Sequence, residues 1–231
     1  MIRANKAIAR TNRIRGLAEL VGELLITVGV VLVLFVGWQL FWTDVVSDAD
    51  AGQVVTTIEQ DPTGPEWVQP KHAKLGDAFA IVRVPRFGAK FAWPLYAGTT
   101  REVLMRGIGH YVDTSLPGEI GNFAIAGHRT TYGKPFNQID KLVEGDVVLV
   151  ETKDTYLVYR VTGYQIVPPT QASVLLPVPD QPGRKPTVAV LTMTTCHPEF
   201  SARERYVVHA ELDATYPRDK GVPADILKVG E

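Results

Sequence analysis

The sequence contains a single cysteine, Cys196, among its 231 residues. A lone cysteine excludes an intramolecular disulfide and any zinc site built from several thiolates. An excess of basic residues is missing as well, because the formal net charge is −1. The chain therefore lacks the strongly positive composition typical of nucleic-acid-binding proteins, and we expect no nucleic acid among its partners.

Several familiar patterns are also missing. No repeat of fixed period is present, which excludes collagen-like and coiled-coil chains. The motifs G-x-S-x-G, H-E-x-x-H and G-x-x-x-x-G-K-[ST] do not occur, nor does the S-H-G-C-type signature of the L,D-transpeptidases. Nothing in the spacing favours a metal site at His110, His128 and Cys196, and no acidic cluster compels calcium binding. We predict neither a metal nor a cofactor.

The amino-terminal end carries the longest apolar run. Residues 24–42 read LLITVGVVLVLFVGWQLFW without a charge, and residues 3–15 include five basic residues and no acidic one. Nineteen helical residues span about 28 Å, the thickness of a hydrocarbon core. We predict a transmembrane helix at 24–42, with residues 1–23 cytoplasmic and the rest of the chain extracytoplasmic, in the cell membrane. A cleaved signal peptide is the rival, but the following FWTD offers no A-x-A site.

The remaining chain divides into three parts by composition. Residues 43–74 are polar and acidic with three prolines, which favours an extended linker. Residues 75–212 contain short runs rich in β-branched and aromatic residues, typical of a closed barrel or a sandwich. Residues 213–231 form a polar tail that we expect to be loosely ordered. The candidate strands are 78–84, 122–126, 146–151, 155–161, 164–167, 188–192 and 205–212.

Shorter signals lie between these strands. The three residues after position 151 predict a hairpin. The stretch 99–102 has the spacing of a capping box before a helical turn, and Pro135 suits the first turn of another, with Ile139 and Leu142 facing inward. The irregular stretch 168–186 holds six prolines. A loop of this length is usually functional or disordered, and its apolar residues 174–176 favour packing or ligand contact.

Three side chains could carry chemistry. Cys196 ends a strand, and a lone thiol facing an oxidising compartment invites a functional explanation, although lone cysteines are more often buried apolar residues. His128 also lies where a strand ends, whereas His197 adjoins Cys196 on the opposite face. A guanidinium near the thiol would suit an oxyanion. The residues alone leave Arg203 and Arg205 as alternatives for that guanidinium.

Two segments resemble the sortase family. They are GEIGNFAIAGHRTTYGKPFNQIDKLVEGDVVLVET, which contains His128, and LTMTTCHPEFSARERYVVHAEL, which contains Cys196. The family's T-L-x-T-C segment is present with Met193 in place of leucine, a swap that conserves volume. The resemblance is to class E sortases of high-GC Gram-positive bacteria, runs from about residue 75 to 212, and selects Arg205 as the family's arginine.

The resemblance implies a closed eight-stranded β-barrel with a few short helices and a two-step transpeptidation. Cys196 would attack the Thr–Gly carbonyl of a carboxy-terminal LAXTG- or LPXTG-like sorting signal, His128 would be the general acid and base, and Arg205 would hold the oxyanion. Tyr111, Thr194 and Thr195 are expected to bind substrate. The partners implied are secreted proteins bearing that signal, an amine on a peptidoglycan precursor, and the lipid bilayer. Alternatives are a non-catalytic peptide-binding barrel or a pilin-polymerising sortase, for which Trp67 could anchor a lid.

Overall fold

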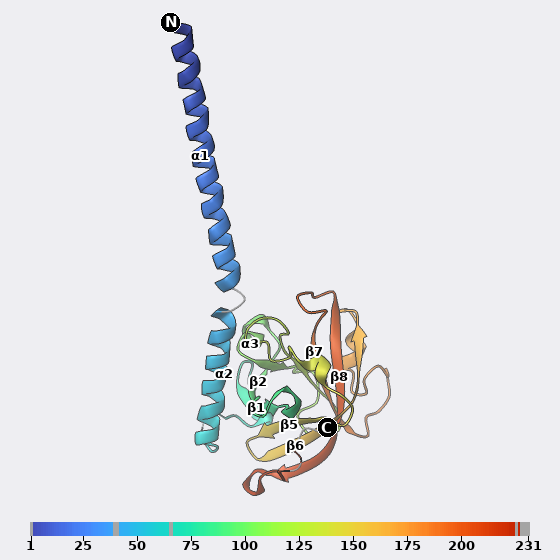
Figure 1. Ribbon diagram of the computed structural model, residues 1–231. Helices are drawn as coiled ribbons and strands as arrows, with labels where there is room; N and C mark the ends of the chain where they lie inside the picture. Colours follow the sequence, from blue (N-terminus) through green and yellow to red (C-terminus); the bar gives the residue numbers. More distant parts are fainter. Residues whose placement is uncertain (1, 39–41, 65–66, 225, 227–231) are drawn as a thin grey trace. The chain divides into compact units, whose positions relative to one another are not determined.

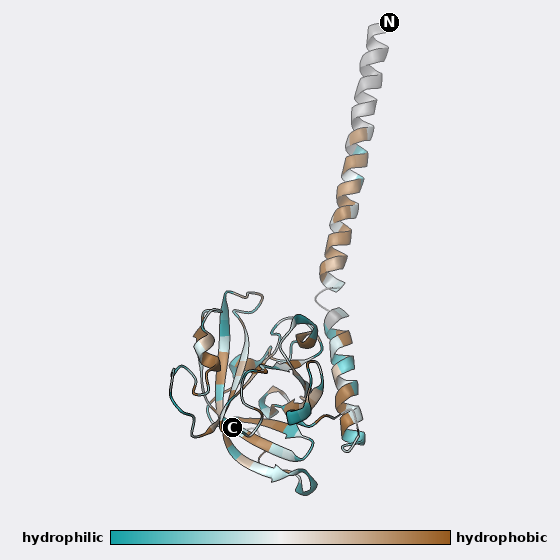
Figure 2. Cartoon of the chain, turned by 180° about the vertical axis from the view of Figure 1, so that it is seen from behind, coloured by the Kyte–Doolittle hydropathy of each residue, from teal (hydrophilic) through white to brown (hydrophobic). Residues whose placement is uncertain are grey.

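The computed structural model describes residues 2–38, 42–64, 67–224 and 226 (Figure 1). The chain forms two compact units, residues 1–42 and residues 43–231. The first unit contains helix α1 (Ile2–Gly37). Within the described residues, the segment Glu19–Gly37 is the one helix long and apolar enough to cross a membrane, and none of it is buried. Figure 2 shows this apolar stretch along the helix. The helix is confirmed as far as Gly37, and residues 39–41 of the predicted span lie outside the described part.

The second unit begins with helix α2 (Thr43–Gln60), so the prediction of an extended linker over 43–74 was wrong for most of its length. Ala51, Val55 and Ile58 are buried and recur at helical spacing. Val55 and Ile58 pack with Trp67 and with Ile81. The stripe was hard to recognise because it is narrow and consists partly of small residues between acidic ones.

Trp67 is part of the same packing. Its side chain is 1% exposed and its indole Nε1 donates to the carbonyl of Phe79 at 3.0 Å. The ring also lies 4.1 Å from the guanidinium carbon of Arg218. Trp67 is therefore a core residue beside the first strand of the barrel, not the anchor of a lid.

Eight strands close into a barrel in the order β1-β2-β3-β4-β7-β8-β6-β5, which confirms the predicted fold. Neighbouring strands are antiparallel except for the parallel pairs β2–β3 and β4–β7. The strands are β1 (Ala78–Arg83), β2 (Trp93–Ala97), β3 (Ile108–His110), β4 (Gly121–Ala126), β5 (Val147–Thr152), β6 (Thr155–Val167), β7 (Ala189–His197) and β8 (Glu204–Pro217).

The barrel interior is filled by alternating side chains from all eight strands. Phe79, Phe123, Tyr159, Leu191 and Met193 belong to the main core cluster and are at most 1% exposed. Met193 thus fills the interior as an apolar residue of leucine's size should. Because side chains alternate along a strand, the neighbours of Leu191 and Met193 in β7 face outward.

Three strand predictions need correction. Strands β2 and β3 were not predicted, because β2 contains Pro94 and β3 has only three residues. The candidate strands 155–161 and 164–167 are one strand, β6, whose pairing with β8 shifts register around Thr162. Strand β8 continues to Pro217, so residues 213–217 are not a loosely ordered tail. Pairing shifts at Asp213 and then resumes, as at a β-bulge.

The remaining connections follow the sequence signals in part. Strands β5 and β6 form the predicted hairpin. Helix α3 (Arg101–Leu104) starts as expected, although its N-cap is Thr100, whose hydroxyl accepts from the amide of Val103. The helical turn expected at Pro135 begins later, as the 3-10 helix η4 (Ile139–Lys141), and Ile139 and Leu142 are buried. Further 3-10 turns among the described residues are η2 (Pro70–His72), η3 (Pro85–Phe87), η5 (Ala172–Leu175) and η6 (Arg218–Lys220).

We predict that Ile58→Ala lowers the unfolding free energy of a fragment spanning residues 43–231 by about 2–4 kcal/mol, since it empties a buried site between α2 and the barrel. Urea denaturation measures the change. The exposed Thr56→Ala in the same helix is the control and should shift the midpoint little. Equal stability of the Ile58 variant and the parent would mean that α2 does not pack on the barrel.

Candidate active site

Cys196 lies near the end of β7 on the outer face of the barrel. It has the same parity as Thr192 and Thr194, whereas Leu191 and Met193 face the core. The thiol is free and partly exposed. The lone cysteine is therefore not a packed core residue, which was the more frequent expectation for an isolated thiol.

Arg205 stands directly opposite Cys196 in the antiparallel pair of β7 and β8. Directly opposed residues project from the same face with Cβ atoms about 4.5–5.5 Å apart. Nη1 of Arg205 donates to the carbonyls of Ala202 and Glu204, both at 3.0 Å. Arg203 precedes β8 and lies in the loop. The strand register thus places Arg205, and not Arg203, beside the thiol.

His128 comes to the same end of the barrel from β4. That strand runs parallel to β7 with Ala126 level with Thr194. The alignment continues past the strand, because the amide of Gly127 donates to the Thr194 carbonyl at 3.2 Å and the Thr195 hydroxyl donates to the Gly127 carbonyl at 2.7 Å. His128 is therefore carried two residues beyond Ala126, as Cys196 is beyond Thr194.

The surroundings of His128 favour its neutral form. Burial lowers the pKa of the imidazole, and the positive charge of Arg101 lowers it further. The ring lies 5.2 Å from that of Tyr132, and Nε2 is buried without a hydrogen-bond partner among the described residues. The residue before His128 must be small, since a Cβ on Gly127 would lie 2.8 Å from the Phe136 ring. The imidazole can therefore accept a proton at a nitrogen that no other group occupies.

Tyr111 and the two threonines form a separate set of contacts. The Tyr111 hydroxyl lies 3.1 Å from Oγ1 of Thr194, which also donates to the Ile125 carbonyl at 3.3 Å. Thr195 has the parity of the core face, and its hydroxyl is used by Gly127. Both threonines are buried. Their side chains tie β7 to β4, while half-buried Tyr111 presents its ring beside Thr194. Their predicted role in substrate binding stays a prediction.

No group of three histidine, cysteine or acidic side chains that could hold a metal occurs in the part of the chain that the structure describes. His110 instead belongs to the barrel. Its Nε2 lies 3.0 Å from the Ser115 carbonyl and 3.1 Å from the Thr114 hydroxyl. Its ring also packs edge-on against Phe79.

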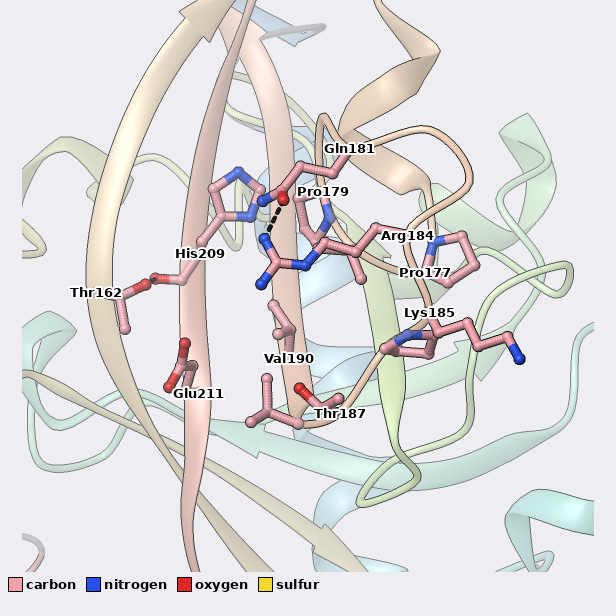
Figure 3. Close-up of a pocket in the computed structure, with 13 residues that line it drawn as sticks. Thr162, Pro177, Pro179, Gln181, Arg184, Lys185, Thr187, Val190, His209 and Glu211 are labelled. Atoms are coloured by element: carbon pink, nitrogen blue, oxygen red, sulfur yellow. Dashed lines mark hydrogen bonds between the residues drawn. The ribbon is translucent and has the colours of Figure 1, made fainter.

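The proline-rich loop 168–186 covers part of the outer face that carries Cys196. Val174 in η5 is buried and packs with Val167 of β6 and Val207 of β8, which agrees with the packing expected of residues 174–176. A cavity of about 280 Å³ lies under the carboxy-terminal half of the loop, next to Val190 and His209 (Figure 3). Val190 is six residues before Cys196 in β7, so this cavity is remote from the thiol.

A chain of hydrogen bonds fastens this loop to the barrel. Buried Asn122 of β4 donates to the carbonyls of Val174 and Leu176, both at 3.0 Å, and accepts from the Thr192 hydroxyl at 2.7 Å. Since that hydroxyl has one proton, Nδ1 of His209 must donate to Thr192 across their 3.0 Å contact.

The far side of the His209 ring completes the connection. Nε2 then accepts from the Gln165 amide at 3.0 Å, and the same amide donates to Asp180 of the loop at 2.7 Å. Asp180 also accepts from the Ser173 hydroxyl at 2.5 Å. This bonding pattern requires neutral His209, and burial lowers the pKa of that imidazole.

Sequence reasoning missed a cluster next to the three candidate residues. Arg129 is buried and its Nη1 lies 2.8 Å from Nδ1 of His197. Its guanidinium carbon lies 5.6 Å from the centre of the Tyr206 ring. The one sequence signal for this cluster is adjacency, because its three residues directly follow His128, Cys196 and Arg205.

Comparisons with known proteins show which family the chain resembles. A family model described as the sortase domain matches residues 82–213. The chain is 38% identical over 215 residues to sortase SrtE1 of Streptomyces coelicolor, which covers 88% of this chain and 59% of that protein. It is 36% identical over 216 residues to sortase SrtE2 of the same organism, covering 85% and 82%. The chain thus spans less than two thirds of the first relative.

A solved structure is similar as well. It is the crystal structure of sortase E1 from Streptomyces coelicolor with a tripeptide in the active site. The match has 37% identity and a TM-score of 0.60, and it covers 68% of this chain and 100% of that chain.

We predict that the fragment 43–231 loses stability as pH falls from about 7 to about 5.5. The pKa values of His110, His128 and His209 are lowered in the folded chain, chiefly by burial. Below about 6.5 the unfolded chain therefore binds more protons than the folded one, and stability present above that pH is lost. Urea denaturation across this range measures the slope. A free energy of unfolding that stays constant or rises on acidification would contradict the buried, neutral state of these rings.

Proposed function

Because this chain belongs to the sortase family, a family of cysteine transpeptidases, we propose that it joins secreted proteins to the cell wall. The proposed substrate is a carboxy-terminal sorting signal of the LAXTG or LPXTG kind, cleaved between Thr and Gly. The proposed acceptor is an amine on a peptidoglycan precursor. The observation that carries the proposal is the pairing of Cys196 with Arg205 across β7 and β8, at the end of the barrel that His128 also reaches.

In the first step, the Cys196 thiol gives its proton to neutral His128 and the sulfur attacks the threonine carbonyl carbon. The new C–S bond converts the carbonyl to a tetrahedral oxyanion. Collapse of that intermediate breaks the C–N bond, and the imidazolium returns the proton to the departing glycine amine. Covalent catalysis of this kind divides one difficult acyl transfer into two easier ones.

In the second step, the acceptor amine attacks the thioester and forms the new amide bond. Its proton passes to His128, and the Cys196 sulfur leaves as a thiolate that recovers a proton from the imidazolium. The lowered pKa of His128 favours the release of the proton in both steps, to the glycine amine in the first and to the thiolate in the second.

Arg205 would stabilise the oxyanion in both steps. A guanidinium keeps its charge and offers five N–H donors in a fixed plane. Two of its hydrogen bonds are made by Nη1 to the backbone carbonyls of Ala202 and Glu204, which fix the orientation of the plane. The other donors are then available to a tetrahedral oxygen next to the sulfur.

The proposed peptide site includes Tyr111, Thr194 and Thr195. The related sortase E1 carries a tripeptide in its active site, which supports peptide binding at the corresponding end of this barrel. Tyr111 lies against Thr194, two residues before the nucleophile, where its hydroxyl could recognise the backbone of a signal with alanine at the second position.

The membrane topology is also part of the proposal. Helix α1 would cross the bilayer, with residues 1–23 in the cytoplasm and the barrel outside the cell. The span 24–42 would be the anchor and residues 75–212 the catalytic barrel. Helix α2 (Thr43–Gln60) packs against Ile81 of β1, and residues 213–217 are the end of β8, which supports counting both with the barrel.

We predict that the full-length chain in detergent releases a glycine-containing product from an L-A-x-T-G peptide when an amine acceptor is supplied, and that hydroxylamine traps the thioester. Cys196→Ala should abolish both. His128→Ala and Arg205→Ala should fold normally and lose at least about 10²-fold in rate. Mass spectrometry of the products measures the cleavage position.

Arg203→Ala is the matched control, because it removes a neighbouring arginine that lies in the loop before β8. It should retain nearly the parental rate. Equal inactivity of the parent and Cys196→Ala would favour a peptide-binding barrel over an enzyme. Near-normal turnover by either the His128 or the Arg205 variant would remove the role proposed for that residue.

A further inference from the structure

Each of the three candidate residues is followed in the sequence by a residue of one cluster, in which Arg129 and Tyr206 are buried and His197 is partly buried. The pairs are His128 with Arg129, Cys196 with His197, and Arg205 with Tyr206. In a strand, consecutive side chains point to opposite faces. Because Cys196 and Arg205 face the outside of the barrel, His197 and Tyr206 project from the opposite face of the same two strands.

The cluster is held together by Arg129. Its Nη1 donates to Nδ1 of His197 at 2.8 Å, because a guanidinium has no acceptor. Its guanidinium carbon lies 5.6 Å from the Tyr206 ring centre, within the range of a cation–π contact. The rings of His197 and Tyr206 are themselves 5.6 Å apart. The Arg129 side chain thus contacts His197, which follows Cys196 in the sequence, and Tyr206, which follows Arg205.

The positive charge of Arg129 is balanced by an ion pair with Asp140. Nη2 lies 3.3 Å from Oδ2 of Asp140 in η4, and the arginine side chain is 6% exposed while that of Asp140 is half exposed. Nε of Arg129 is buried and has no hydrogen-bond partner among the described residues. An ion pair between a buried arginine and a half-exposed carboxylate, with one guanidinium donor left unsatisfied, contributes little to folding stability. Stability alone therefore gives a poor reason for an arginine at this position.

A second tie joins the same segments. The Asn137 amide donates to the backbone carbonyl of Arg129 at 3.0 Å and to Oε1 of Glu199 at 2.8 Å. Glu199 lies in the loop between Cys196 and Arg205. The segment that carries His128 is thus connected to β7 and β8 through the Arg129 side chain, and to the loop between these strands through the Arg129 carbonyl and Asn137.

We propose that Arg129 is a positioning residue that holds the His128 segment in register with Cys196 and Arg205 through His197 and Tyr206. This inference rests on the proposed transpeptidation. Acyl transfer is sensitive to small errors in the placement of the acid, the nucleophile and the oxyanion donor. Arg129 contacts neither the thiol nor the candidate substrate residues, so its loss should disturb the alignment of the reacting groups more than peptide binding.

The test compares Arg129→Met with the parent, as full-length chains in detergent with the L-A-x-T-G peptide and the amine acceptor. Methionine keeps an unbranched apolar side chain and lacks the planar guanidinium group. We expect kcat to fall by about 30-fold or more, KM to change by less than about threefold, and the melting temperature to stay close to that of the parent. Arg129→Lys retains the positive charge but lacks the planar guanidinium group. On a logarithmic scale, the kcat of this variant should lie closer to that of Arg129→Met than to that of the parent.

The matched control is Arg83→Met, which removes a half-buried arginine of β1 that pairs with Glu151 and Glu59. It should lower the melting temperature at least as much as Arg129→Met while keeping kcat. A kcat for Arg129→Met within threefold of the parent, or a loss that merely follows the melting temperature in both variants, would overturn the positioning role.

A failure of the proposed function gives a different result. In that case the parent itself would not turn over the peptide, although its lone cysteine reacted normally with iodoacetamide. An active parent together with an active Arg129→Met variant would overturn the positioning role alone.

Discussion

The pairing of β7 with β8 decides which side chains meet at the candidate active site. In this register Cys196 is opposite Arg205, and Met193 and Val208 turn into the core. A slip of one residue would exchange the two faces of β7 and place apolar side chains outside the barrel. The packing of the core therefore also fixes the chemistry at its edge, because the same alternation that buries Met193 brings Cys196 outward.

The parallel pairing of β4 with β7 adds the third residue to this arrangement. Hydrogen bonds from Gly127 and Thr195 continue the alignment beyond the last paired strand residues. Parallel strands end on the same side of a sheet, so His128 and Cys196 reach the same end of the barrel although they are far apart in the sequence. The loops beyond the strands then need their own supports, which Asn137 and Arg129 provide.

The barrel, the candidate nucleophile and its two partners could be predicted because they lie in strongly patterned strands or in motifs that resemble a known family. Local patterns were insufficient elsewhere. Parity alone left Arg203 and Arg205 open. The resemblance to the family selected Arg205, and the register of β7 with β8 places that residue opposite Cys196. Helix α2 was missed because its buried stripe contains small residues, and Arg129 was missed because its partners come from segments 68 or more residues away in sequence or from a helix that starts later than expected.

The bonds of Asn122, Thr192, His209 and Gln165 have a consequence for any molecule that binds beside loop 168–186. The loop is already fastened to the barrel, because the carbonyls of Val174 and Leu176 and the carboxylate of Asp180 accept hydrogen bonds from barrel side chains. A ligand that packs against it would not have to order it first, so little of the binding energy is lost to conformational entropy. A ligand would therefore bind to a preformed surface on that side of the barrel. The heat-capacity change of binding would be small, because no disordered segment folds in the process.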